Sequence, residues 1–495
     1  MMGEAVGSIT TGWTHFIPGI VVMMGNTLTV RRKFAADPHR PRYHFLPPAN
    51  WMNDPNGVIQ WNGQYHLFYQ YNPHGPLWGD MHWGHAVSQD LIHWTDLSVA
   101  LAPTPGGPDE AGCFSGCAVN NGLPTLVYTG TRGTRQEIQT QCLATSQDNL
   151  LTWQKYAGNP VLSAVPAESG QAADFRDPFV WREDTSWYMA VGSRIKDVGG
   201  TVFLFRSPDL LDWEYLNPLL VGDINRNGVI WECPNLFKLG EHWVLIVSAH
   251  TGTKTGLVLY FVGSYDNYRF TPTYDGVLDY GNLYAPLTMV DSQNRRLLFG
   301  WLREARPIAE QQAAGWSGVQ SVPRRLELDA RGRLTMTPVA ELEVIRGKHH
   351  HYDAVDLSGD IRLDVEGLAL EIVAEFEPKP DGRCGITLAC SADGKERLDL
   401  VYEACNQCLV VTRVSPDQNA SLTTDAQEAP HELAPGEPLQ IRVLFDGSVV
   451  EIIGNDRTSL VSRVYPSHAD NNKVHLLGTH ARLRSLDIWE MSSIW

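Results

Sequence analysis

The chain has 495 residues and a formal net charge of −17 at pH 7, with 43% hydrophobic and 19% charged residues. This composition is typical of a globular protein with two to four domains of about 150 residues each, and the acidic charge argues against a nucleic-acid partner, whose phosphates require a cationic surface. The 16 Trp and 17 Tyr favour carbohydrate, because a flat apolar face with a polar edge suits a sugar ring, although the filling of β cores explains them equally well.

Residues 1–42 are predicted to be an N-terminal extension. Residues 5–30 contain no Asp, Glu, Lys or Arg, but polar residues interrupt the apolar run and Glu4 stands where a signal peptide carries positive charge. A start at Met23 or Met24 would remove most of this segment. No later segment is apolar enough to span a bilayer, so we expect no membrane partner and favour a cytoplasmic enzyme, with secretion as the alternative.

Residues 43–337 carry an internal repeat that predicts a five-bladed β-propeller. A serine, an aspartate two positions later and a closing aromatic recur at steps of 58, 61 and 57 residues, starting at Ser88, Ser146, Ser207 and Ser264. Hairpins in which apolar and polar residues alternate around short turns are predicted at 57–71, 178–193, 234–250 and 285–302. Repeats of this length with about four strands each are typical of propeller blades, whereas two unrelated sandwiches would not explain the regular step.

One position recurs just before the inner strand of each predicted blade. From residue 54 the steps are 61, 62, 55 and 52 residues, and the positions hold Asp54, Ser115, Asp177, Glu232 and Tyr284. Inner strands line the central channel of a propeller, so equivalent corners of five blades meet at one axial pocket. Each motif alone is also consistent with a turn or a surface ion pair. Their recurrence in one register favours a functional site, because crowded carboxylates raise one another's pKa.

Residues 345–495 lose this rhythm and predict a C-terminal β-sandwich. The predicted strands are 368–378, 398–404, 440–454 and 485–491. The polar run 346–351 ends in three histidines and is interpreted as a solvated linker, with a metal tract as the alternative. Eight cysteines are too few for a disulfide framework. The pair Cys405 and Cys408, with Cys384 and Cys390 upstream, has zinc-like spacing, but a hairpin turn with small buried side chains is favoured.

Three converging carboxylates suit the hydrolysis of a glycosidic bond. One carboxylate attacks the anomeric carbon, and a second protonates the leaving oxygen and later deprotonates water. A third binds sugar hydroxyls while positive charge develops on the ring. The predicted pocket therefore indicates a glycosidase.

At these motifs the sequence resembles glycoside hydrolase family 32, which includes invertases, inulinases, levanases and fructan exohydrolases. The resemblance extends from about residue 43 to residue 495. It is carried by Trp51-Met-Asn-Asp-Pro-Asn-Gly57, Phe114-Ser-Gly116, Phe175-Arg-Asp-Pro178 and Trp231-Glu-Cys-Pro234, and by the segments 68–94, 283–289 and 315–326.

The resemblance implies a retaining enzyme that releases β-D-fructofuranosyl units from sucrose or short fructans by double displacement, without a metal or cofactor. Asp54 would attack C2 of the fructosyl unit, and Glu232 would act as the general acid and then the base. Asp177, with Arg176, would bind fructose hydroxyls and stabilise the transition state. The carboxyl groups of Asp54 and Glu232 would then lie about 5–5.5 Å apart. The further candidates for sugar contacts are Asn53, Gln70, Trp78, Phe114, Ser115, Cys233, Tyr284 and Trp301.

Other functions stay open at this stage. An α-L-arabinofuranosidase or β-xylosidase on the same propeller would be an inverting enzyme with more widely separated carboxylates. A fructosyltransferase would share all three carboxylates and differ in its acceptor, and a non-catalytic carbohydrate-binding propeller would not need a proton donor. Asn235 stands where many relatives carry an Asp that helps some invertases to hold glucose, so a strict sucrose preference does not follow. The sequence also leaves a homo-oligomer open.

Overall fold

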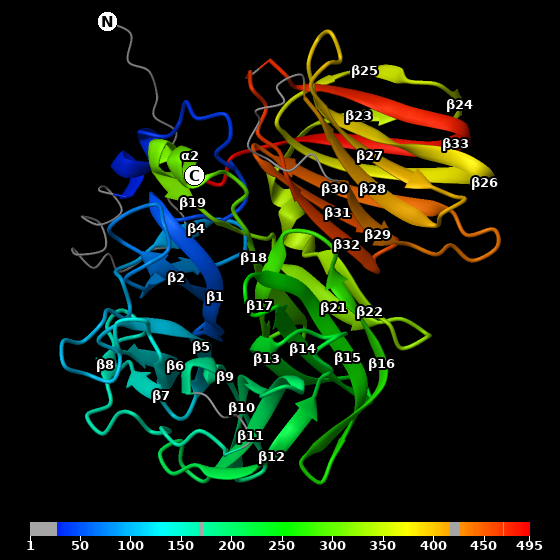
Figure 1. The fold of residues 1–495 in the computed structure, drawn as a ribbon. Coiled ribbons are helices and arrows are strands. Elements are labelled where there is room, and N and C mark those ends of the chain that lie inside the picture. The colour runs from blue at the N-terminus through cyan, green and yellow to red at the C-terminus, as the bar shows by residue number, and fades with distance from the viewer. Residues whose placement is uncertain (1–26, 168–171, 416–425, 469) are drawn as a thin grey trace, which may run out of the picture.

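The computed structural model describes residues 27–167, 172–415, 426–468 and 470–495, which form a ring of five sheets and a second, larger sheet assembly (Figure 1). The predicted all-β fold, a five-bladed propeller followed by a sandwich, is confirmed. The expectations for the first 26 residues lie outside the described part of the chain. No helix in the described part combines the length and the apolar character that a membrane crossing needs.

The blades follow one another in chain order, and each is an antiparallel sheet. The first blade contains β1 (Asn50–Trp61), β2 (Gln64–Asn72), β3 (His82–Ser88) and β4 (Trp94–Asp96). The second contains β5 (Gly112–Asn120), β6 (Pro124–Arg132), β7 (Ile138–Thr145) and β8 (Gln154–Lys155). The third contains β9 (Arg176–Glu183), β10 (Ser186–Ile195), β11 (Gly199–Ser207) and β12 (Glu214–Val221). The fourth contains β13 (Ile230–Leu239), β14 (His242–His250), β15 (Thr255–Asp266) and β16 (Arg269–Asp279).

The fifth blade closes the ring. It contains β17 (Leu283–Val290), β18 (Arg296–Leu302), β21 (Arg324–Leu328) and β22 (Leu334–Pro338), with β20 (Val319–Gln320) paired to β18. The first strand of each blade contacts the first strand of the next, and β17 contacts β1. Between β18 and β21, helix α2 (Ile308–Ala314) leads into β19 (Trp316–Ser317), which pairs in parallel with β1. This pairing ties the end of the fifth blade to the inner strand of the first.

The repeated serine–aspartate motif forms the turn between the third and fourth strands of a blade. In the first three blades the serine hydroxyl donates to the aspartate two residues later, and that carboxylate accepts backbone N–H groups of the turn. In the fourth blade, β15 and β16 are instead joined by a tight turn in which Asn267 and Tyr268 adopt positive φ. The motif therefore lies at the third-to-fourth strand connection in all four blades, and its serine–aspartate hydrogen bond forms in the first three.

The second unit contains the strands β23 to β33 (Figure 1). After the short helix η2 (Ala340–Ile345), they are β23 (Arg346–Tyr352), β24 (Val355–Ser358), β25 (Ile361–Glu366), β26 (Ala369–Cys390), β27 (Arg397–Glu403), β28 (Cys408–Val414), β29 (Gln427–Pro430), β30 (Leu439–Asp446), β31 (Val449–Gly454), β32 (Thr458–Arg463) and β33 (Lys473–Met491). The interpretation of 346–351 as a solvated linker is wrong, because this segment is strand β23 and pairs with β33. One face of an antiparallel sheet can be solvated, so a strand can consist largely of polar residues. A run of polar residues therefore does not distinguish such a strand from a linker.

The four cysteines of the zinc-like pattern do not come together. Cys384 and Cys390 are buried on β26, whereas Cys405 is exposed in the turn between β27 and β28. The predicted hairpin turn is present, although Cys405 is not one of the small buried side chains that we expected. All eight cysteines of the chain are free thiols.

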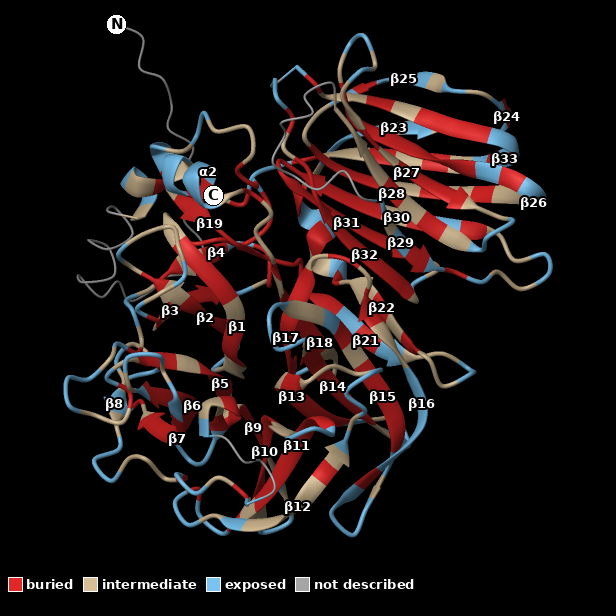
Figure 2. Ribbon diagram, viewed as in Figure 1, coloured by how far each residue is buried: buried red, intermediate tan, exposed pale blue. Residues whose placement is uncertain are grey.

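Buried side chains follow the strands of both units, and exposed residues lie mainly on the loops between them (Figure 2). The two units also meet through a buried ionic cluster. His44, ahead of the first blade, contacts Asp446 through Nδ1 and Glu451 through Nε2, each at 2.9 Å. Arg324 of β21 binds Glu451, and all four side chains are fully buried. We call these four residues the junction cluster.

Candidate active site

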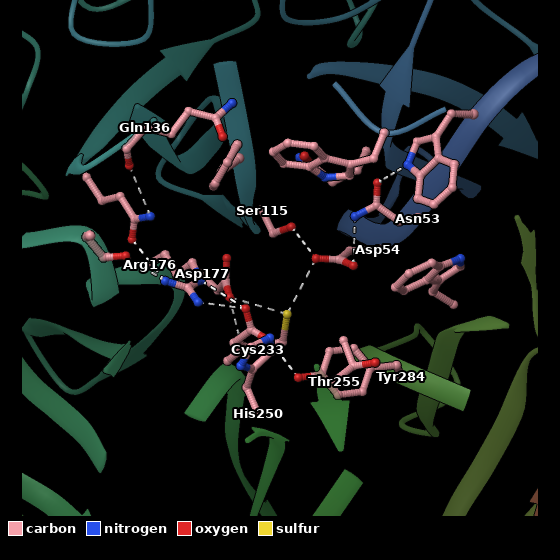
Figure 3. A pocket seen from close by; sticks show the side chains of 18 of the residues that line it. Asn53, Asp54, Ser115, Gln136, Arg176, Asp177, Cys233, His250, Thr255 and Tyr284 are labelled. Atoms are coloured by element: carbon pink, nitrogen blue, oxygen red, sulfur yellow. Dashed lines mark hydrogen bonds and ion pairs between the residues drawn. The ribbon is translucent and has the colours of Figure 1, made fainter. Parts of the chain in front are cut away.

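The axial end of the propeller opens into one cavity of about 480 Å³ (Figure 3). The twelve residues predicted from the sequence all line it, and they come from the inner strands of the five blades, from the second strands β2 and β18, and from the loop after β2. They are Asn53, Asp54, Gln70, Trp78, Phe114, Ser115, Arg176, Asp177, Glu232, Cys233, Tyr284 and Trp301. Asp54 and Glu232, 178 residues apart in the chain, thus open onto the same cavity.

A bulge in each inner strand brings the side chains into the cavity. The pairing of the first strand with the second shifts register between Met52 and Pro55 in the first blade and between Glu232 and Asn235 in the fourth. The other three blades have a shift at the corresponding place. A bulge bends the strand and redirects the side chains beside it, which explains why these residues leave the regular sheet and face the axis.

The register predicted from spacing is wrong by one residue in two blades. Asp177, Cys233 and Ala285 each precede a proline and each have positive φ, of 64°, 48° and 48°. Glu232 and Tyr284 therefore correspond to Arg176, and the counterpart of Asp177 in the fourth blade is Cys233. Residue steps alone could not reveal this, because loop lengths differ between blades. Alignment on the prolines would have done so.

The one-residue offset produces two layers of polar side chains. In the first layer, Asp54 accepts a hydrogen bond from Ser115 Oγ at 2.6 Å and another from Asn53 Nδ2 at 3.0 Å. The Cys233 thiol lies between Asp54 and Asp177, with its sulfur 3.7 Å and 3.5 Å from their carboxylate oxygens (Figure 3). The backbone N–H of Cys233 also donates to Asp177 at 3.1 Å. Two carboxylates are thus held on either side of one small, polarisable side chain.

The second layer contains Arg176, Glu232 and Tyr284. The guanidinium of Arg176 donates twice to Glu232 Oε1, at 2.8 Å and 3.0 Å, and the Tyr284 hydroxyl donates to Oε2 at 2.5 Å. Arg176 is itself fixed by Gln139 Oε1 at 3.2 Å and by the backbone carbonyl of Ala173 at 2.9 Å. Both oxygens of Glu232 are therefore engaged before any sugar arrives.

Close packing of the backbone supports this layer. A Cβ placed on Gly192 of β10 would lie 2.4 Å from the carbonyl oxygen of Trp231 and 3.3 Å from Cα of Glu232. Only a glycine lets the third blade approach the fourth closely enough at this point. Trp231 is fully buried, and its indole N–H donates to the carbonyl of Asn227, so the residue next to Glu232 is held in place by packing and by a hydrogen bond.

The three carboxylates have shifted pKa values. Burial raises the pKa of Asp54 to about 6, partly opposed by its hydrogen bond from Ser115. Burial also raises the pKa of Asp177, to about 7, against the charge of Arg176. Burial alone would raise the pKa of Glu232 as well, but Arg176 and Tyr284 together hold it below its ordinary value. In the empty site Asp54 and Asp177 are therefore protonated more readily than Glu232, and the three carboxylates titrate as a coupled group.

Aromatic side chains form the walls of the cavity. Trp301 stands edge-on to Trp51, with ring centroids 5.8 Å apart, and its indole nitrogen is buried without a hydrogen-bond partner in the protein. Trp78, on the loop after β2, is 52% exposed and lies edge-on to Phe114 at the rim. An exposed Trp beside a polar cavity offers an apolar face to a sugar ring.

The sequence reasoning missed several residues that line the cavity, namely Trp51, Arg135, Gln136, Gln139, Ala173, His250 and Thr255. Trp51 opens the first motif and His250 ends the second strand of the fourth blade, so their places in the repeat were available as signals. Gln139 lies on a third strand, where no motif marked it. Conversely, Asn235 does not line the cavity: it is fully buried and bonds to the backbone of Cys233, Pro286 and Thr288.

A propeller whose axial cavity gathers three carboxylates, two arginines and several aromatic walls defines a glycoside hydrolase. The model for the glycosyl hydrolases family 32 N-terminal domain matches residues 44–338, and the model for the family 32 C terminal matches residues 341–490. The chain belongs to glycosyl hydrolase family 32.

Relatives and solved structures agree with this assignment. The chain is 36% identical to a sucrose-6-phosphate hydrolase of Zymomonas mobilis, over 86% of this chain and 87% of the relative. It is 34% identical to a levanase of Bacillus subtilis, over 96% of this chain and 75% of the relative. The crystal structure of fructan 1-exohydrolase IIa from Cichorium intybus matches with a TM-score of 0.83 and 27% identity, covering 92% of this chain and 98% of that one. The structure of a beta-fructofuranosidase mutant from Bombyx mori in complex with sucrose matches with a TM-score of 0.78 and 29% identity, covering 96% of this chain and 99% of that one.

Proposed function

We propose that this enzyme releases β-D-fructofuranosyl units from sucrose or short fructans with net retention of configuration. The observation that carries the proposal is the unequal treatment of Asp54 and Glu232 within one cavity. Asp54 accepts hydrogen bonds from neutral groups, namely the Ser115 hydroxyl, the Asn53 amide and the Cys233 thiol. Glu232 has one oxygen held by the charged guanidinium of Arg176 and the other by the Tyr284 hydroxyl. Two carboxylates in different environments can take the different roles that double displacement requires.

Asp54 is the proposed nucleophile. Its hydrogen bonds from Ser115 and Asn53 fix the carboxylate and favour its ionised form, and no cation neutralises it directly. A carboxylate that is oriented but not ion-paired keeps a lone pair for attack on the anomeric carbon C2. The bond from C2 to the leaving oxygen breaks as the bond to Asp54 forms, and water later reverses this step at the same carbon.

Glu232 is the proposed general acid and base, and Arg176 controls its proton. While the ion pair with Arg176 is intact, Glu232 holds a proton poorly. Sugar hydroxyls that accept the N–H groups of Arg176 would weaken the ion pair and raise the pKa of Glu232. The proton retained by the cluster then passes to Glu232 and from there to the leaving oxygen. Asp177, on the other side of Cys233, binds hydroxyls and stabilises the positive ring.

The experiment is a hydrolysis panel followed by NMR of the first product formed. Sucrose, raffinose, kestose, inulin and levan are compared, and sucrose 6-phosphate is included because Arg135 lines the cavity and offers positive charge to a phosphate. Release of β-fructofuranose before mutarotation is the expected result. Release of the α anomer, or activity on arabinosides alone, would contradict the proposal. The carboxyl separation of about 5–5.5 Å between Asp54 and Glu232 stays a prediction.

A transferase, which the sequence alone left open, is not favoured by the hydrolases that the chain resembles. Both reactions proceed through the same covalent intermediate and differ in whether water or a sugar hydroxyl takes up the fructosyl unit. At high sucrose concentration we expect free glucose and fructose to form in nearly equal amounts. An excess of glucose with growth of fructosyl oligomers would identify a transferase.

We also propose that the enzyme works in a reducing compartment, the cytoplasm, rather than after secretion. All eight cysteines are free thiols, and Cys405 is exposed, which suits a reducing environment. Fractionation of the producing cells, with activity followed in each fraction, tests this. The formation of a homo-oligomer stays a prediction, which light scattering would test.

A further inference from the structure

The run of three histidines that opens the sandwich lies on a paired strand, β23, and its side chains alternate between two faces. His349 and His351 lie on one face, together with Asp487 of the neighbouring strand β33. His351 is directly opposite Asp487 in the register, and His349 is its diagonal neighbour. The rings of both histidines are about half exposed, at 45% and 49% of their side-chain surface.

We propose that His349, His351 and Asp487 form a binding site for a divalent transition-metal cation such as Zn²⁺. Nε2 of His349 and Nδ1 of His351 both lie 2.8 Å from the same carboxylate oxygen of Asp487. One ligand atom from each residue lies within 4.8 Å of the other two. Among the described residues this is the group of His, Cys, Asp and Glu side chains whose ligand atoms converge in this way.

The geometry needs little adjustment to accept an ion. Zn²⁺ binds His nitrogen and carboxylate oxygen at about 2.0–2.2 Å, which places neighbouring ligand atoms of a tetrahedral site about 3.3 Å apart. The two nitrogens need to move a few tenths of an ångström away from the Asp487 oxygen, and the two exposed rings can turn towards each other from within 4.8 Å. The protons now shared between the ring nitrogens and Asp487 leave to the solvent on binding, so the nitrogen lone pairs face the ion. Water fills the remaining positions.

Two neighbouring groups orient the histidines. The ring of His349 stacks on Trp489, with centroids 4.8 Å apart and an angle of 9° between the planes. Nε2 of His351, the nitrogen that faces away from Asp487, lies 3.6 Å from a carboxylate oxygen of Asp353. A carboxylate behind a coordinating histidine fixes its tautomer and strengthens it as a ligand.

The ligand set selects the class of metal and suggests its effect. Two imidazoles favour zinc, copper or nickel over magnesium and calcium, which prefer oxygen ligands. The ion would join β23, the first strand of the sandwich, to β33, the last one. Because it binds only the folded arrangement, it should raise the melting temperature without altering the chemistry of the propeller cavity.

Isothermal titration with ZnCl₂, in a reducing buffer without chelators, tests the site. We expect one ion to bind per chain, with affinity reduced at least about tenfold in His349→Gln and in His351→Gln, and no binding to this site in the double variant. The matched control is His350→Gln, since His350 belongs to the same run but lies on the other face and contacts Glu490 at 2.9 Å. This control and Cys405→Ser, which removes the exposed thiol, should bind as the wild type does.

A second readout identifies the ligands directly. Electron paramagnetic resonance with Cu²⁺ should show two coordinated ring nitrogens in the wild type and in His350→Gln, and at most one in His349→Gln. The melting temperature should rise with Zn²⁺ only in variants that keep both histidines. A wild-type Kd above about 1 mM, equal loss in His350→Gln, or full binding by the double variant would overturn the proposal.

Discussion

The axial cavity and the junction between propeller and sandwich both bury ionisable side chains, but they balance the charges differently. The cavity holds three carboxylates, Asp54, Asp177 and Glu232, and Arg176 forms an ion pair with one of them, Glu232. The junction cluster holds two carboxylates, Asp446 and Glu451, and matches them with His44 and Arg324.

The pKa values follow this balance. At the junction, Arg324 and His44 outweigh the effect of burial and lower the pKa of Glu451 to about 2. Asp446 accepts three backbone N–H groups, from Arg42, Tyr43 and His44. In the cavity, by contrast, Asp54 and Asp177 have raised pKa values. Burial of acids alone does not mark the reactive site; burial without matching positive charge does.

The largest effect should follow from removing the reacting carboxylates. Asp54→Ala and Glu232→Ala should each lower kcat by about 10⁴-fold, because each removes a group that bonds to or protonates the substrate in the transition state. Azide should distinguish the two roles. In Glu232→Ala it should yield the β-fructosyl azide through the enzyme intermediate, and in Asp54→Ala the α anomer by direct attack. NMR of the products decides, and the same anomer from both variants would contradict the assignment.

The junction cluster should show the opposite response, with a loss of stability and no loss of chemistry. Glu451→Gln leaves Arg324 buried without its charge partner, which should lower the free energy of unfolding by about 3–5 kcal/mol. Urea unfolding followed by Trp fluorescence measures this. Since Glu451 does not line the cavity, kcat per folded molecule should stay at the wild-type value. A fall in kcat under conditions where the variant is fully folded would show that the two regions are coupled.

The same contrast explains what the sequence could reveal. The cavity was predictable because its residues belong to a repeat, and the motifs around Asp54, Asp177 and Glu232 recur at similar steps. The junction was not, because His44 and Asp446 are 402 residues apart and no local pattern links them. The pairing of β23 was missed for the same reason, because its partner β33 lies far away in the chain. The offset of Glu232 was missed because loop lengths differ between blades.

The junction should also give the fold a characteristic pH dependence. Burial alone would lower the pKa of His44, but its bonds to Asp446 and Glu451 raise it to about 9. Because this is above the ordinary value of about 6.5, the stabilisation is full below pH 6.5 and is lost as pH rises towards 9, by about 3 kcal/mol in total. The difference in unfolding free energy between wild type and His44→Gln should shrink over this range. A constant difference from pH 6 to 9 would contradict the protonated state of His44.

The smallest effect should come from Asp177→Asn, and this substitution should raise rather than lower the free energy of unfolding. The folded pKa of Asp177 is about 7, above the ordinary value near 4, so ionisation destabilises the fold increasingly as pH rises from about 4 to 7. The amide removes this penalty and still accepts the N–H of Cys233, so the variant should be more stable than the wild type at pH 8 and unchanged at pH 4. Its kcat should fall at least about 100-fold, because a charge that stabilises the transition state is lost.

The matched control for this variant is Asp446→Asn, an equally conservative change in the junction cluster. Asp446 accepts hydrogen bonds from three backbone N–H groups and contacts His44 at 2.9 Å, so its replacement by an amide should destabilise the fold at pH 8 and leave kcat unchanged. Urea unfolding at pH 4 and pH 8 compares the two variants. Destabilisation by both substitutions would mean that the surroundings of Asp177 compensate its negative charge as fully as the surroundings of Asp446 do. Stabilisation by Asp177→Asn alone would show that the enzyme maintains an unfavourable charge where the reaction occurs.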